Sequence, residues 1–229
     1  MKTVALVLVG LSFIVGCGPS VDPAAKADID ARVQALTAPK RSFPAPTVFE
    51  PMPFAVGQWL KIKLVDDKGQ PSFMTQKITG QDGDAFWFEM VTEAYTGKTL
   101  VKILMAVANR TDPNTIDIRG GAMKDHKGNV TLFEGPLLSM MRGTYKEMMA
   151  TMVITWQGLP QEDAAVPAGA FTGCFKGRTD VAWGPWRSAT TSWSHPAVPI
   201  SGMVKAVGID KPTTMELVDF GTSGAVSEF

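Results

Sequence analysis

Alternation of apolar and charged residues between residues 58 and 108 constrains the fold more than any other feature of this chain. In residues 58–66, apolar Leu60, Ile62 and Leu64 are separated by lysines. A period of two is typical of a β-strand with one buried and one solvated face. The chain is therefore expected to begin its folded part as an antiparallel sheet.

Three more strands are predicted directly after the first, over residues 72–79, 85–95 and 99–108, with turns at residues 66–69 and 96–98. Successive strands joined by short turns form an antiparallel meander. The side chains expected to point inward from the third and fourth strands are Phe86, Phe88, Met90, Val101, Ile103, Met105 and Val107.

Six further strands are expected in the rest of the chain. They are predicted over residues 115–119, 152–156, 170–179, 181–193, 202–207 and 213–220. Residues 158–169 contain proline and acidic residues and are expected to form a loop. The tail, residues 221–229, is small and polar enough to be expected to fray.

Two helices are predicted. Asp22 followed by Pro23 is a typical N-cap and first helical position, and a helix over residues 24–36 follows. The second helix, residues 137–149, is rich in methionine, and either Met140 or Met141 falls on its apolar stripe with Met148. The fold class is thus mainly β (α+β), with a Pro- and Phe-containing segment, residues 39–53, expected to dock on the sheet.

An apolar run at the start of the chain has the layout of a secretory signal, with Lys2 before it and Ile14-Val15-Gly16-Cys17 at its end. These four residues resemble the lipobox of bacterial lipoproteins. The resemblance implies that residues 1–16 are removed and that Cys17 carries the acyl chains that tether the protein to a membrane, an attachment that several chains make lasting. In enteric bacteria, an Asp directly after the lipidated Cys favours retention of the lipoprotein at the inner membrane. This chain has Gly18 at that position, which points to the periplasmic side of an outer membrane. The outer face of the cytoplasmic membrane and the cell surface are the alternatives.

The expected organisation has three parts. Residues 1–16 form the signal peptide, residues 17–54 form a lipidated tether with a helix and the Pro-rich segment, and residues 55–229 form a single antiparallel β domain.

The order of these elements resembles the half-barrel of periplasmic lipoprotein carriers and their outer-membrane acceptors. In that family a bent sheet surrounds a helical plug and holds acyl chains. A second pattern, carried by residues 166–174, 193–199, 202–205 and 215–218, is similar to one in uncharacterised secreted bacterial proteins related to that fold. The resemblance implies a curved antiparallel sheet that holds a lipid or acyl chain in its concavity.

On this basis an apolar ligand is expected in the concavity of the sheet. The candidate binding residues are Phe86, Phe88, Met90, Val101, Ile103, Met105, Met140, Met141 and Met148. Thirteen Met and twelve Phe supply large, adaptable side chains for such a site. A filled core without a cavity explains the same residues equally well.

Catalysis is not expected. His126 falls in a polar turn, and Ser194 and His195 are strand neighbours whose side chains point to opposite faces. Cys174 is flanked by apolar strand residues, as a buried structural cysteine would be. No ligand set has zinc spacing, and no cofactor or metal is predicted. A formal net charge of zero argues against nucleic acid.

The main rival function is that of an accessory subunit in an envelope complex. The Pro-rich segment, the Met-rich helix or the turn from Trp183 to Trp186 would then be a protein interface.

The lipobox interpretation predicts the behaviour of one substitution. The Cys17→Ser protein should lose N-terminal acylation and move from the membrane to the soluble fraction, because the thioether cannot form. Fractionation and intact-mass measurement check this, and a Cys17→Ser protein that is still acylated would contradict it.

Overall fold

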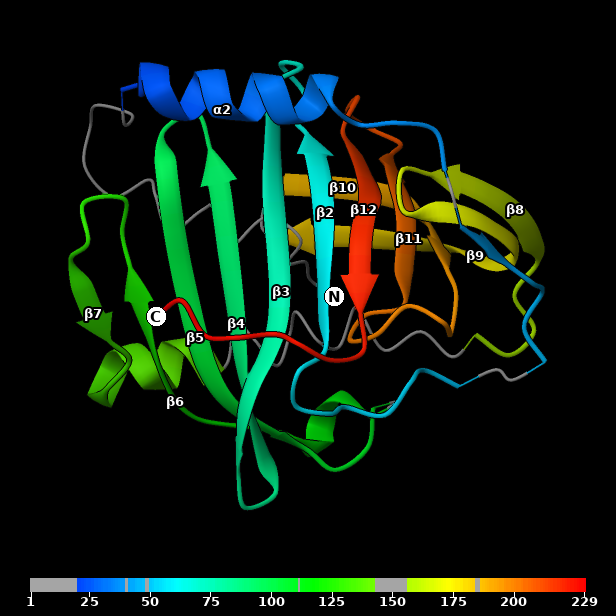
Figure 1. The fold of residues 1–229 in the computed structure, drawn as a ribbon. Helices are drawn as coiled ribbons and strands as arrows, with labels where there is room; N and C mark the ends of the chain where they lie inside the picture. The colour runs from blue at the N-terminus through cyan, green and yellow to red at the C-terminus, as the bar shows by residue number, and fades with distance from the viewer. Residues whose placement is uncertain (1–19, 40, 48–49, 111, 143–155, 184–185) are drawn as a thin grey trace.

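The computed structural model describes residues 20–229, apart from residues 40, 48–49, 111, 143–155 and 184–185. Cys17 and the signal before it lie outside the described residues. Within them, twelve strands form one curved, unclosed sheet in the order β1-β9-β10-β11-β12-β2-β3-β4-β5-β6-β7, and β8 pairs with β9 (Figure 1). The predicted fold class, a mainly β protein with helical elements, is confirmed.

The predicted meander is present. It consists of β2 (Trp59–Val65), β3 (Pro71–Asp82), β4 (Ala85–Ala94) and β5 (Gly97–Val107), each antiparallel to the next. Two-residue turns join β3 to β4 and β4 to β5, and Gly83 in the first turn has a φ of 59°, a conformation that glycine adopts without strain. The alternation of residues 58–66 thus predicted strand β2, and the two-residue turns fix the register of the β3–β4 and β4–β5 pairs.

The second half of the sheet comes from the end of the chain. β9 (Gly169–Trp183) and β10 (Trp186–Ser194) form a hairpin, as predicted, but β9 extends past its predicted end at residue 179 and includes residues 181–183, which were assigned to the second strand. β11 (Met203–Gly208) and β12 (Thr214–Gly221) follow. β12 then pairs with β2, so the last strand joins the first strand of the meander. Bulges in the β10–β11, β12–β2, β3–β4 and β5–β6 pairs bend the strands and add to the twist.

Three strands were not predicted, and the length of a fourth was wrong. β8 (Gln161–Val166) lies inside the segment expected to be a loop, because Ala164 and Val166 are buried against β9 while the acidic residues stay exposed. β6 (Ile116–Lys124) is longer than expected. The two shortest strands, β1 (Ser42–Phe43) and β7 (Val130–Leu132), were not predicted. β1 is parallel to β9.

The sheet has an inner and an outer face. On the inner face, Phe171 of β9 and Ile62 of β2 belong to one buried cluster although three strands separate β9 from β2 in the sheet, so this face is the concave one. The outer face carries Lys61, Lys77 and Glu89 from neighbouring strands.

Helix α2 (Pro23–Gln34) covers one end of the outer face (Figure 1). The Asp22 side chain accepts a hydrogen bond from the N–H of Ala24 at 2.8 Å, which confirms the predicted N-cap. Ile29 is fully buried beneath the helix. Arg32 makes a bidentate ion pair with Glu93 of β4 at 2.9 and 2.8 Å, which fixes the helix on the sheet.

The described part of the Pro-rich segment docks on the sheet as predicted. Phe43 stacks on Phe171 with ring centroids 4.4 Å apart, and Phe54 packs edge-on against Phe88 at 5.0 Å. The segment therefore contributes aromatic rings to the inner face from outside the meander.

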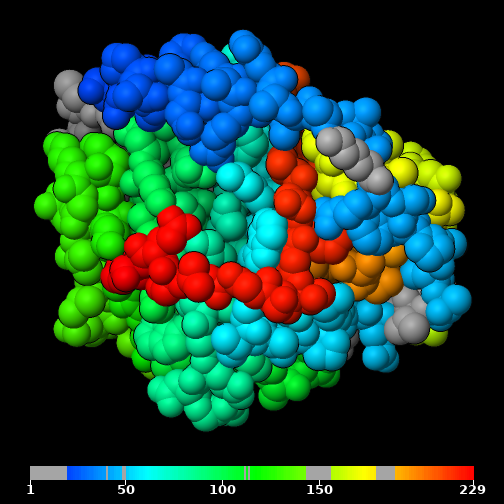
Figure 2. All heavy atoms as spheres, viewed as in Figure 1, coloured from blue at the N-terminus to red at the C-terminus, as the bar shows by residue number. Residues whose placement is uncertain are grey.

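The tail, residues 222–229, does not fray, and the prediction that it would is wrong. We call it the strap, since it crosses the outer face below α2 (Figure 2). Glu89, which is 1% exposed, accepts hydrogen bonds from Ser227 Oγ at 2.6 Å and from the Glu228 N–H at 2.8 Å. Glu228 also forms ion pairs with Lys77 and Lys98. A tail of small polar residues is held here because it satisfies a buried carboxylate.

Residues 135–142 are helical, which agrees with the start of the predicted Met-rich helix; the remainder, with Met148, lies outside the described residues. Within the described part of the chain, no helix combines the length and apolar character that a membrane crossing requires.

Removal of residues 225–229 should lower the free energy of unfolding by about 2 kcal/mol, because the buried Glu89 carboxylate loses two charge-assisted hydrogen bonds. Urea denaturation measures the change. Val226→Ser is the matched control: its side chain is 72% exposed, so its effect should stay within about 0.5 kcal/mol. Equal stability of the truncated and complete chains would contradict the role of the strap.

Candidate functional site

Three cross-strand pairs form the centre of the inner face. Phe86 lies opposite Met105, Phe88 opposite Ile103 and Met90 opposite Val101 in the β4–β5 ladder. These are six of the seven strand residues that alternation placed inward, and the structure brings them together on one face. Directly opposed side chains of this kind are in contact, so they form a continuous apolar strip.

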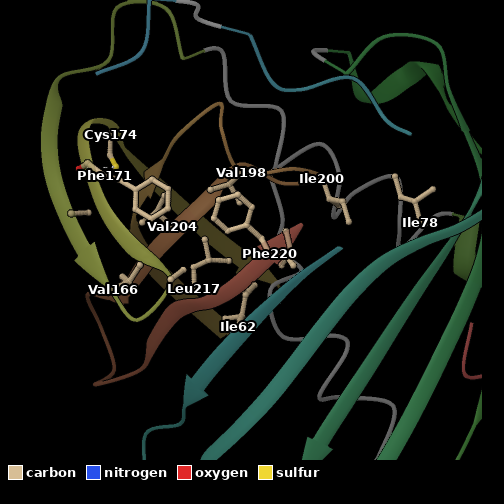
Figure 3. Close-up of a cluster of buried hydrophobic side chains, with 13 residues drawn as sticks. Ile62, Ile78, Val166, Phe171, Cys174, Val198, Ile200, Val204, Leu217 and Phe220 are labelled. Carbon is tan, nitrogen blue, oxygen red and sulfur yellow. Dashed lines mark hydrogen bonds between the residues drawn. The ribbon is translucent and has the colours of Figure 1, made fainter. Parts of the chain in front are cut away.

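Two buried clusters meet along this strip. The first combines residues of β2, β3, β8, β9, β11 and β12 with the loop before β11, and Figure 3 shows it spread from Cys174 and Phe171 to Ile78. The second contains Val101, Ile103 and Met105 together with Ile118, Phe133 and Met141. Phe88 packs against both clusters. The inner face is thus one apolar surface with Phe88 at its junction.

Burial differs along the strip. Ile103 and Met105 are each 4% exposed, as expected of a filled core. Phe86, Phe88 and Met90 are only partly buried, although they lie in the middle of the sheet. A closed core would bury aromatic side chains at such a position completely. The apolar surface at the junction therefore remains partly accessible.

The helix over residues 135–142 covers the second cluster. Met141 is 2% exposed and packs into the cluster, whereas Met140 is 54% exposed and points away from it. Of the two alternatives, Met141 thus occupies the apolar stripe, and Met140 is not part of either buried cluster. Met148, the last candidate, lies outside the described residues. Gly121 of β6 makes the close packing feasible, since a Cβ there would lie 2.7 Å from the Phe133 ring.

Arg110 lies beside this surface and was not predicted as a site residue. It follows β5, and its guanidinium stacks over the Phe54 ring at 4.1 Å. It donates hydrogen bonds to the backbone carbonyls of Met52 and Ile200. Burial lowers the pKa of Arg110 to about 10, so the group stays charged at neutral pH. An arginine after a strand in a polar turn is normally solvated, so the sequence contained no signal for this position.

The two histidines have structural surroundings. His126 is exposed in a turn that Asp125 closes by accepting from the N–H groups of Lys127 and Asn129, as the sequence predicted. His195 is 3% exposed, its Nε2 lies 3.1 Å from the Pro44 carbonyl, and its Nδ1 accepts from the Ala197 N–H. Burial lowers the pKa of His195, which favours the neutral ring. With Nδ1 occupied as an acceptor, His195 bridges two segments of backbone.

A hollow of about 510 Å³ lies on the outer face between α2 and the strap. Its charged walls are already neutralised: Asp219 pairs with Arg41 at 2.6 Å, and Arg32 pairs with Glu93. It is open to solvent and shares no lining residue with the predicted ligand site.

No group of three or more His, Cys, Asp or Glu side chains in the described residues is arranged to hold a metal ion.

Comparison with known proteins found no relative of this chain: no family model, curated protein or solved structure matches it.

Cys174 should resist alkylation in the folded protein. It is 0% exposed, and burial raises the pKa of its thiol to about 12, so almost no thiolate exists at pH 8. We expect the native Cys17→Ser protein to be unmodified by iodoacetamide at pH 8 by intact mass, and to gain one adduct after unfolding in urea. Rapid alkylation of the native protein would show that Cys174 is accessible and reactive.

Proposed function

We propose that this protein is a membrane-tethered envelope lipoprotein that binds an apolar ligand, such as a lipid or an acyl chain, against the inner face of its sheet. The observation that carries the proposal is the partial burial of Phe86, Phe88 and Met90 at the junction of the two apolar clusters. A curved sheet with accessible aromatic rings on its concave side offers an apolar chain both contact area and shelter from water.

The proposed function involves no catalysis and needs no cofactor. The thiol of Cys174 is buried, and the ring nitrogens of His195 face backbone groups. Neither provides an activated nucleophile or a base with access to a substrate. The proposed anchor is the acylated Cys17, and the proposed location is the periplasmic side of the outer membrane.

One observation favours a second function, that of an accessory subunit acting through protein contacts. β7 lies at an edge of the sheet, and its Val130 and Leu132 side chains are 52% and 57% exposed. An apolar edge strand can accept a partner strand by pairing. An envelope protein with an exposed strand would be the partner in that case.

Native mass spectrometry with organic extraction tests the first function. The full-length Cys17→Ser chain, which lacks its own acyl groups under the lipobox interpretation, should copurify with a stoichiometric lipid or fatty acid. Phe88→Glu should lower occupancy at least about tenfold, since it places a charge against the apolar chain. A clean apo mass for the folded protein would contradict the proposal.

Trp87→Glu is the matched control for this substitution. Trp87 is the next aromatic residue on β4 and lies on the outer face, where Lys102 is 5.2 Å from its ring and can accommodate a carboxylate. Occupancy should be unchanged in this variant. Equal loss in both variants would indicate damage to the fold, and thermal melting of each variant shows whether that is so.

A further inference from the structure

Arg110 is a partly buried cation that has no counter-charge among the described residues. None of the ion pairs between described residues includes it, and its acceptors are the carbonyls of Met52 and Ile200. A guanidinium has five N–H donors, so three are left without an acceptor among the described residues. Carbonyl dipoles and a phenyl ring offset only part of the cost of moving a full charge partly out of water.

Arg41 shows what a compensated arginine looks like in the same protein. It also stacks on aromatic rings, at 4.6 Å from the Phe220 centroid, and it also donates to a backbone carbonyl, that of Ala168 at 3.0 Å. Arg41 additionally reaches the Asp219 carboxylate at 2.6 Å. Arg110 has the same stacking and the same kind of carbonyl contact, but no carboxylate from the described part of the chain pairs with it.

The surroundings of Arg110 hold it at the end of the apolar strip. Phe54, the ring beneath its guanidinium, packs against Phe86 at 6.1 Å and Phe88 at 5.0 Å. One aromatic ring thus separates the charge from the accessible part of the inner face. An amphiphile whose chain lies on Phe88 would bring its head group to Arg110.

The backbone at Ile200 supports the same position. Ile200 has a φ of 62°, a left-handed conformation that a β-branched residue adopts only at a cost. Its side chain remains in the first cluster while its carbonyl accepts from Arg110. The loop before β11 therefore maintains a strained residue whose carbonyl orients the guanidinium.

We infer that Arg110 binds an anionic head group, a carboxylate or a phosphate, of the ligand whose chain lies against the inner face. This inference rests on the proposed function and specifies its ligand: a single-chain amphiphile with a negative end. A planar guanidinium with free donors binds either anion through charge-assisted, bidentate hydrogen bonds.

Three probes with the same chain test it: dodecanoate, dodecyl phosphate and dodecanol, titrated calorimetrically at pH 8 into the full-length Cys17→Ser protein. At least one anionic probe should bind at least about tenfold more tightly than the alcohol. Which of the two binds better identifies the head group as carboxylate or phosphate. In Arg110→Gln that advantage should fall below about threefold, while the affinity for dodecanol stays the same. Arg41→Gln, the matched control, should keep the full advantage.

Each outcome has a distinct meaning. Equal binding of anion and alcohol to the protein with Arg110 intact would overturn the inference but leave the proposed function standing. A loss of affinity for all three probes in Arg110→Gln would show that Arg110 only positions the loops, and would overturn it too. Absence of binding by every probe would refute the proposed function and this inference with it. If Arg110→Gln does not fold, the head-group comparison in the protein with Arg110 intact still decides.

Discussion

The pairing of β12 with β2 is the interaction on which the rest of the structure depends. It places Leu217 opposite Ile62, both 0% exposed, and joins strands separated by most of the chain. Such a long-range pairing is entropically expensive to form, and the apolar burial at its centre offsets that cost. Without it the meander and the C-terminal strands would be two separate sheets, each with an exposed apolar face. With it, β9 and β2 contribute to one cluster, and the curved sheet has an interior.

The outer and inner faces of the curved sheet have different roles. The outer face binds α2 and the strap through charge: Glu93 pairs with Arg32, and the buried Glu89 is satisfied by Ser227 and Glu228. The inner face is apolar, and rings from outside the meander, such as Phe54, complete it. Because α2 and the strap bind on the outer side, they leave the accessible rings of the inner face uncovered. The arrangement favours a binding surface on the concave side over one on the convex side.

The sequence predicted local structure well and long-range structure poorly, for a physical reason. Alternation in residues 58–108 encoded four strands and the direction of their side chains, since a period of two determines which residues share a face. The choice between Met140 and Met141 was left open because neighbouring positions fit a helical stripe almost equally well. β8 was missed because only Ala164 and Val166 mark its buried face, and the strap was missed because its stabilising partner, Glu89, is far away in sequence. The surroundings of Arg110 could not be predicted for the same reason, because both its carbonyl acceptors and Phe54 come from other segments of the chain.

These misses share a feature with the candidate site. The sequence shows that a charged residue is present, but it does not show whether water, a carboxylate or neither surrounds that residue in the folded protein. Glu89 is buried and Arg110 is partly buried. The strap donates hydrogen bonds to Glu89, whereas Arg110 donates to two backbone carbonyls and stacks on a ring, and no anion among the described residues pairs with it. Because a desolvated charge is costly unless an opposite charge approaches it, the missing half of the Arg110 site is expected to be an anion from outside the chain. The apolar strip that begins one ring away indicates what that anion is attached to.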